Sequence, residues 1–89
     1  MHLKEVKFRP RTDEHDYNFK LTHIKNFLEK NNKVKITIQF RGREMAHKEL
    51  GYNLLERLRK DLEEFGSFES TPKMEGRFLI TFVTTKKKS

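Results

Sequence analysis

The chain alternates between stretches with a two-residue apolar period and stretches with a helical period. The first alternating stretch, from Lys4 to Arg9, puts Val6 and Phe8 on one side and charged residues on the other. This alternation predicts a half-buried strand, which Pro10 ends because proline cannot donate a hydrogen bond to a sheet.

A helix is expected next, because apolar residues recur at spacings of four, three and four, as on the buried face of an amphipathic helix. These residues are Tyr17, Leu21, Ile24 and Leu28. Asn31 and Asn32 end the pattern. The side chains that can cap the start of this helix, two of them acids that suit its positive end, are Thr12, Asp13 and Asp16.

The second alternating stretch runs from Lys33 to Arg41 and predicts another strand. A second helical stripe extends from Leu50 to Phe65, with Gly66 as the expected C-cap. Gly51 inside this helix costs about 1 kcal/mol relative to alanine, which is as compatible with close packing at that position as with a tolerated accident. The inward residues of the second strand are Val34, Ile36, Ile38 and Phe40.

The last third of the chain predicts shorter elements. We expect a short strand from Phe68 to Ser70, a turn from Pro72 to Gly76 and a final strand from Arg77 to Thr84. Residues 85–89 are expected to form a basic, flexible tail. The residues of the final strand that are expected to face the core are Phe78, Ile80 and Phe82.

This order of elements, β-α-β-α-β-β, predicts an α/β (α+β) domain. Two helices can cover only one face of a small sheet, so we expect a two-layer sandwich on a four-stranded mixed sheet. The strand–helix–strand unit should make the first two strands parallel, and the final strand pair should be antiparallel. Residues 1–89 are expected to form a single domain with a modest core.

Composition excludes several classes of protein. With 20 basic and 13 acidic residues, the formal net charge is 20 − 13 = +7, which favours a nucleic-acid partner. No apolar run approaches the ~20 residues of a membrane span, and the mean hydropathy is −0.92. The sequence has no cysteine, no zinc-binding spacing and no nucleotide-binding phosphate loop. We therefore expect a monomer without enzyme activity, cofactor, metal or membrane partner.

Basic side chains gather on the predicted outward sides of the strands and on the turn that follows the second strand. In that turn two arginines flank Gly42, so two planar cations stand where no bulky side chain restricts the backbone. Each cation alone is typical of a solvated surface, but together they predict phosphate binding. The cluster consists of Lys7, Arg9, Lys35, Arg41, Arg43 and Arg77, with Arg57 on the flank of the second helix.

Proteins that read single-stranded RNA on a sheet carry aromatic rings on its open face. Here the predicted phase turns the phenylalanines of the strands inward, so we expect recognition of phosphates and RNA shape with little reading of bases. The outward positions, which offer no stacking surface in this phase, are Thr37, Gln39, Leu79, Thr81 and Val83.

Four blocks of the chain, in this order, resemble the C-terminal domain of bacterial translation initiation factor three. They are Lys4 to Pro10, Thr12 to Tyr17, Arg41 to His47 and Pro72 to Arg77. The resemblance covers nearly the whole chain and implies the same βαβαββ fold. The N-terminal domain and lysine-rich linker of the full factor are absent from these residues.

The resemblance implies binding of small-subunit ribosomal RNA on the platform, opposition to association with the large subunit, and support for selecting initiator tRNA and the start codon. The implied partners are the small ribosomal subunit with its RNA and adjacent ribosomal proteins, in the bacterial cytoplasm, or in an organelle if a transit segment was removed. The family's RNA contacts, carried to matching positions, are Arg9, Lys20, Arg41, Arg43, Arg57 and Arg77, and we add Lys73 from the last block.

Two positions depart from the pattern of the family. Relatives tend to carry further arginines where this chain has Thr22 and Asn26, which lowers the expected share of the first helix in RNA binding. The alternative is a generic basic α/β module that binds RNA or protein. A preference for the small ribosomal subunit over other RNA distinguishes the two readings.

Overall fold

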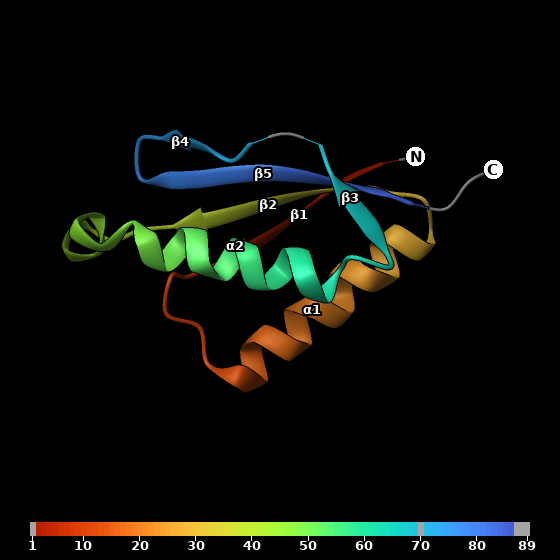
Figure 1. Ribbon diagram of the computed structural model, residues 1–89, viewed down its shortest axis with the longest axis horizontal. Coiled ribbons are helices and arrows are strands. Elements are labelled where there is room, and N and C mark those ends of the chain that lie inside the picture. The colour runs from red at the N-terminus through yellow and green to blue at the C-terminus, as the bar shows by residue number, and fades with distance from the viewer. Residues whose placement is uncertain (1, 70, 87–89) are drawn as a thin grey trace.

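The computed structural model describes residues 2–69 and 71–86. The elements follow the predicted order, with a 3-10 helix and a short strand added (Figure 1). They are β1 (Leu3–Phe8), α1 (Glu14–Glu29), β2 (Lys33–Gln39), the 3-10 helix η1 (Gly42–His47), α2 (Glu49–Asp61), β3 (Gly66–Phe68), β4 (Lys73–Glu75) and β5 (Phe78–Thr85).

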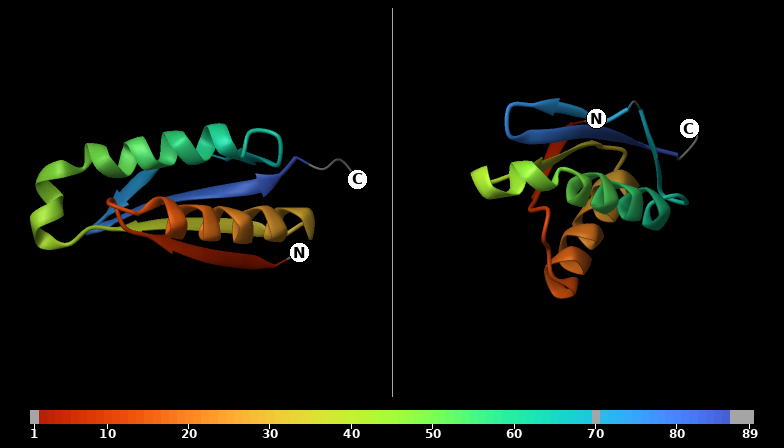
Figure 2. Two further views of the ribbon diagram at one scale, coloured as in Figure 1. Left: turned by 90° about the horizontal axis from the view of Figure 1, so that it is seen from below. Right: turned by 60° about the vertical axis from the view of Figure 1, so that its left-hand side comes forward.

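The predicted two-layer sandwich is confirmed. Both long helices lie on one face of the sheet, and the opposite face is left without a helix (Figure 2). The sheet has the order β1-β2-β5-β3, with β4 also pairing with β5. The β1–β2 pair is parallel and the β5 pairs are antiparallel, as expected.

The sheet has five strands and not the predicted four. The segment expected to be only a turn contains β4, which pairs with the first half of β5, while β3 pairs with its second half. Gly66 is not a helix C-cap as predicted, because α2 already ends at Asp61 and Gly66 begins β3. A Cβ on Gly66 would lie 2.7 Å from Cγ1 of Val83, so the strands approach closely there.

The phase of the final strand is opposite to the prediction. Leu79, Thr81 and Val83 are buried against the helices, whereas the side chain of Phe78 is 37% exposed. The register explains this, since Val83 pairs with Val34 and Leu79 pairs with Ile38. Paired residues of antiparallel strands share one face, so the buried phase of β2 fixes that of β5. The stripe now placed on the uncovered face is Phe78, Ile80 and Phe82.

Local capping follows the chemistry of the side chains. Asp13 is the N-cap of α1, and its Oδ1 accepts a hydrogen bond of 2.8 Å from the backbone N–H of Asp16. Asn31 after this helix has a φ of 63°, a left-handed conformation that asparagine tolerates better than most residues. These caps set the length of α1, whose inward face carries the four predicted apolar residues.

The end of the chain, residues 85–89, was expected to form a flexible tail. Thr85 still belongs to β5, and the N–H of Lys86 donates to the carbonyl of Phe65 over 3.3 Å. The other tail residues, 87–89, and Ser70 of the predicted short strand lie outside the described residues.

No helix within the described part of the chain is long and apolar enough to cross a membrane.

Candidate nucleic-acid interface

The arginine turn lies on η1 at one end of the molecule. Arg41 precedes this 3-10 helix and Arg43 lies in its first turn, and both side chains are exposed. The carboxylate of Glu44 accepts a 2.8 Å hydrogen bond from the backbone N–H of Arg41. This bond fixes the backbone of the turn and leaves both guanidinium groups directed at solvent.

A third arginine joins them from another segment. Arg11 lines a hollow of about 590 Å³ with both turn arginines, beside His47. β1 and β2 are parallel, so the segments that follow them leave the sheet at the same edge. Arg11 is not among the predicted contacts, although Arg9-Pro10-Arg11 directly after the first strand, together with the parallel pairing, was a signal that pointed to it.

Arg77 lies beside this group. The backbone N–H of Phe40 donates to the carbonyl of Arg77 over 2.8 Å, which places Arg77 next to the start of the arginine turn. The turn between β4 and β5 and the helix η1 lie at the same end of the molecule (Figure 1). Arg9, also predicted, is only partly exposed, and its Nη1 atom is buried without a hydrogen-bond partner.

We call the exposed group Arg11, Arg41, Arg43 and Arg77 the arginine end. No ion pair is formed by these four side chains within residues 2–69 and 71–86. Unpaired guanidinium groups can receive phosphate oxygens without first losing a carboxylate partner. The arrangement is therefore suited to binding a polyanion.

Arg57, another predicted RNA contact, is placed differently. Its two Nη atoms each lie 2.7 Å from a carboxylate oxygen of Glu14, and its guanidinium carbon lies 3.8 Å from the centroid of the Tyr17 ring. The hydrogen bonds from Arg57 lower the pKa of Glu14, and the same bonds raise the pKa of Arg57. Arg57 thus joins α2 to α1 and must leave Glu14 to reach a phosphate.

Tyr17 and Asp61 complete this contact between the helices. The Tyr17 hydroxyl donates to Oδ2 of Asp61 over 2.5 Å, and Asp61 also lies 3.9 Å from Nε of Arg57. Burial of Tyr17, followed by this hydrogen bond, raises the pKa of its hydroxyl. We call Glu14, Tyr17, Arg57 and Asp61 the helix clamp.

The predicted lysines do not join the arginine end. Lys20 donates to the carbonyl of Lys7 over 2.5 Å and lies 3.4 Å from Asp16. Lys35 lies 3.9 Å from Glu5. Lys7, Lys35 and Lys73 belong to strands of the sheet and, by its register, face the side without helices.

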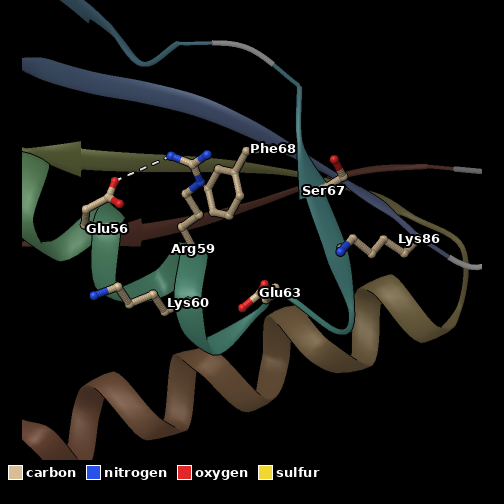
Figure 3. Close-up of a pocket in the computed structure, with 8 residues that line it drawn as sticks. Glu56, Arg59, Lys60, Glu63, Ser67, Phe68 and Lys86 are labelled. Atoms are coloured by element: carbon tan, nitrogen blue, oxygen red, sulfur yellow. Dashed lines mark ion pairs between the residues drawn. The ribbon is translucent and has the colours of Figure 1, made fainter.

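Figure 3 shows a second hollow, of about 370 Å³, between α2 and β3. Basic and acidic side chains alternate around it, and Arg59 lies 3.7 Å from Glu56. Because its charges are mixed and partly paired, it offers no concentrated positive field. No group of three metal-binding side chains exists among the described residues.

Fold and charge together define a small basic α/β sandwich with unpaired arginines at one end. A family model described as "Translation initiation factor IF-3, C-terminal domain" matches residues 1–86, and the chain belongs to that family. It is 55% identical over 86 residues to translation initiation factor IF-3 of Ralstonia nicotianae and 56% identical over 85 residues to that of Aromatoleum aromaticum. These alignments cover 97% and 96% of this chain and 48% and 49% of the relatives, so the chain spans about half their length.

Proposed function

We propose that this domain acts in translation initiation by binding RNA of the small ribosomal subunit in the bacterial cytoplasm. Bound there, the bulk of the domain excludes the large subunit and so supports selection of initiator tRNA and the start codon. No bond is made or broken, so the output is an occupancy set by affinity and concentration.

One observation carries this proposal: among the described residues, the exposed arginines at one end of the molecule form no ion pair, whereas those on α2 are paired. Of the seven arginines, Arg57 and Arg59 have carboxylate partners, and the arginine end holds the four exposed ones for which the described part of the chain supplies none. Each phosphate that a cation neutralises releases condensed counterions, which adds affinity. The arginine end is therefore the surface at which we place the RNA backbone.

The family supports the partner. Relatives named translation initiation factor IF-3 share more than half of their aligned residues with this chain. A factor of that name acts with the ribosome, and phosphate groups cover the surface of ribosomal RNA. All of the predicted RNA contacts stay predictions. Lys20 and Arg57 each already have a partner within the protein, so we do not place them at the arginine end.

Binding to purified small subunits across a salt series tests the proposal. With about four phosphates neutralised, log affinity should fall against log salt with a slope of roughly −2.8 to −3.6. Arg41→Ala and Arg77→Ala should each weaken binding about fivefold at physiological salt and make that slope shallower by nearly one.

Arg59→Ala is the matched control, because Arg59 is an exposed arginine of α2 that lies outside the arginine end. It should leave small-subunit affinity within twofold. Large subunits and an unrelated structured RNA serve as comparators, and blocked subunit joining is the functional readout. Equal binding to small subunits, large subunits and the unrelated RNA would overturn the proposal and favour a generic basic module. Equal losses of affinity for Arg41→Ala, Arg77→Ala and Arg59→Ala would do the same.

A further inference from the structure

The face of the sheet opposite the helices carries an apolar stripe that the sequence placed in the core. Phe78, Ile80 and Phe82 alternate along β5, which lies inside the sheet between β2 on one side and β3 and β4 on the other. Phe78 is 37% exposed, and the other two are partly exposed. Phe78 and Phe82 are four positions apart, which corresponds to about 13 Å along a strand.

Polar and charged side chains border the stripe in register. Gln39 of β2 pairs with Phe78, and Lys35 pairs with Phe82. On the other side, Lys73 of β4 pairs with Ile80, and Glu75 pairs with Phe78. A groove of about 350 Å³ runs here, lined by Lys35, Thr71, Lys73, Glu75, Ile80 and Phe82.

The rings of Phe78 and Phe82 differ in how far other side chains cover them. Nζ of Lys33 lies 4.9 Å from the centroid of the Phe82 ring and is itself paired with Glu69 at 2.6 Å, so one side of that ring is covered. Phe78 has no ring or cation contact within the described residues. Phe78 is therefore the open position of the stripe.

Phe78 follows Arg77 of the arginine end in the chain, so the exposed end of the stripe lies at the same end of the molecule as the proposed phosphate surface. An RNA strand held there by its phosphates would reach the exposed ring by passing around the end of the sheet. Bases stack on aromatic faces whatever their sequence, and amide side chains pair with base edges. An exposed phenylalanine beside Gln39, with lysines along the groove, is an arrangement that accepts a nucleotide strand.

We propose that the uncovered sheet face is a second RNA-binding surface, which takes unpaired nucleotides by stacking a base on Phe78. Gln39 lies beside that base, Ile80 and Phe82 form the apolar floor, and Lys35 and Lys73 approach the backbone. The surface rests on the proposed function for its partner and adds single-stranded RNA to the structured RNA bound at the arginine end.

A tryptophan probe tests stacking directly, since the chain contains no tryptophan. In Phe78→Trp the single indole should be quenched when an unpaired RNA oligonucleotide binds, and a blunt-ended, fully paired RNA duplex should quench it far less. Phe19→Trp is the matched control, because Phe19 is 60% exposed on α1, away from this face. Its indole should not respond to either RNA.

Affinity for the same unpaired oligonucleotide gives the second readout. Phe78→Ala should weaken binding about fivefold or more, Phe78→Tyr should restore it, and Phe19→Ala should change it less than twofold. An unquenched indole at Phe78, or equal losses for Phe78→Ala and Phe19→Ala, would overturn the inference.

Small-subunit binding by Arg41→Ala separates the two proposals. If Arg41→Ala loses affinity while the Phe78 probe stays silent, the phosphate surface stands and the stacking surface is rejected. If the Phe78 probe responds while Arg41→Ala and Arg77→Ala bind the subunit as well as the parent, the stacking surface stands and the proposed function fails at the arginine end.

Discussion

Arg57 and Arg41 are both exposed arginines, but their surroundings give them different roles. Arg57 is bound to Glu14 and stacked on Tyr17 between two helices, whereas Arg41 has no ion-pair partner in the described part of the chain. We expect Arg57→Ala to lower the melting temperature and to leave RNA affinity nearly unchanged. Arg41→Ala should lower RNA affinity and leave the melting temperature nearly unchanged. Thermal unfolding and subunit binding, measured on both variants, check this. If both variants lost melting temperature and subunit affinity in the same proportion, the different roles given to Arg57 and Arg41 would be contradicted.

The pair of Glu14 and Arg57 also makes stability depend on pH. Because Arg57 lowers the pKa of Glu14 in the folded state, the unfolded chain binds this proton more readily than the folded protein. The stabilisation is therefore present above the ordinary carboxyl pKa of 4.5 and is lost as the pH falls through the lowered value.

Glu14→Gln should accordingly melt at a lower temperature than the parent near neutral pH, and the difference should shrink as the solution becomes acidic. Glu63→Gln is the control, since the carboxylate of Glu63 forms no ion pair within residues 2–69 and 71–86. Melting curves across an acid series check both variants. A difference for Glu14→Gln that stays constant with pH would show that the clamp does not depend on charge.

At the scale of elements, Gly51 shows how closely α2 approaches the sheet. A Cβ added there would lie 2.5 Å from Cζ of Phe40, a ring that is almost fully buried and cannot move aside freely. Overpacking a core costs about 1–3 kcal/mol, which exceeds or matches the roughly 1 kcal/mol of helix propensity that alanine gains.

The net cost is therefore up to about 2 kcal/mol, and we expect Gly51→Ala to lower the melting temperature by up to about 8–16 °C. Gly42→Ala provides the contrast, because a Cβ there meets nothing within 4 Å, and its stability should stay within about 0.5 kcal/mol of the parent. Chemical or thermal unfolding distinguishes the two. Equal stability of the two variants would mean that Phe40 relaxes more easily than its burial indicates.

The elements also show what could be predicted from the sequence. The helices and β2 follow from their apolar periods, because each has one strongly apolar face. In the last strand both phases are rich in apolar residues, so alternation alone could not choose between Phe78 and Leu79 as the inward residue. The choice is made by pairing with β2, a long-range contact that the local pattern does not contain.

The same reason explains what the sequence revealed of the candidate site. Arg41 and Arg43 are two positions apart in the chain, so their cluster was evident, while Arg11 reaches the same hollow only through the parallel pairing of β1 and β2. The partners of Arg57 were hidden likewise, since Glu14 lies 43 residues away along the chain. Sequence reasoning found local charge clusters and missed contacts that tertiary structure creates.

For the whole molecule, the question is whether the total charge of +7 or its placement directs binding. A net positive field speeds encounter with any polyanion, whereas tight binding needs cations at the phosphates. Two double variants separate these effects, because Arg41→Glu with Arg43→Glu and Arg59→Glu with Lys60→Glu each lower the formal net charge by four, from +7 to +3.

If placement decides, the first pair should weaken small-subunit binding at least about tenfold more than the second at physiological salt, since two phosphate contacts are lost only in the first. Affinity and blocked subunit joining should then fall together, because the domain acts by occupying its site. Association rates should decline similarly in both variants, as the shared change in net charge requires. Equal losses of affinity would instead identify this domain as a carrier of charge whose specificity lies outside the arginine end.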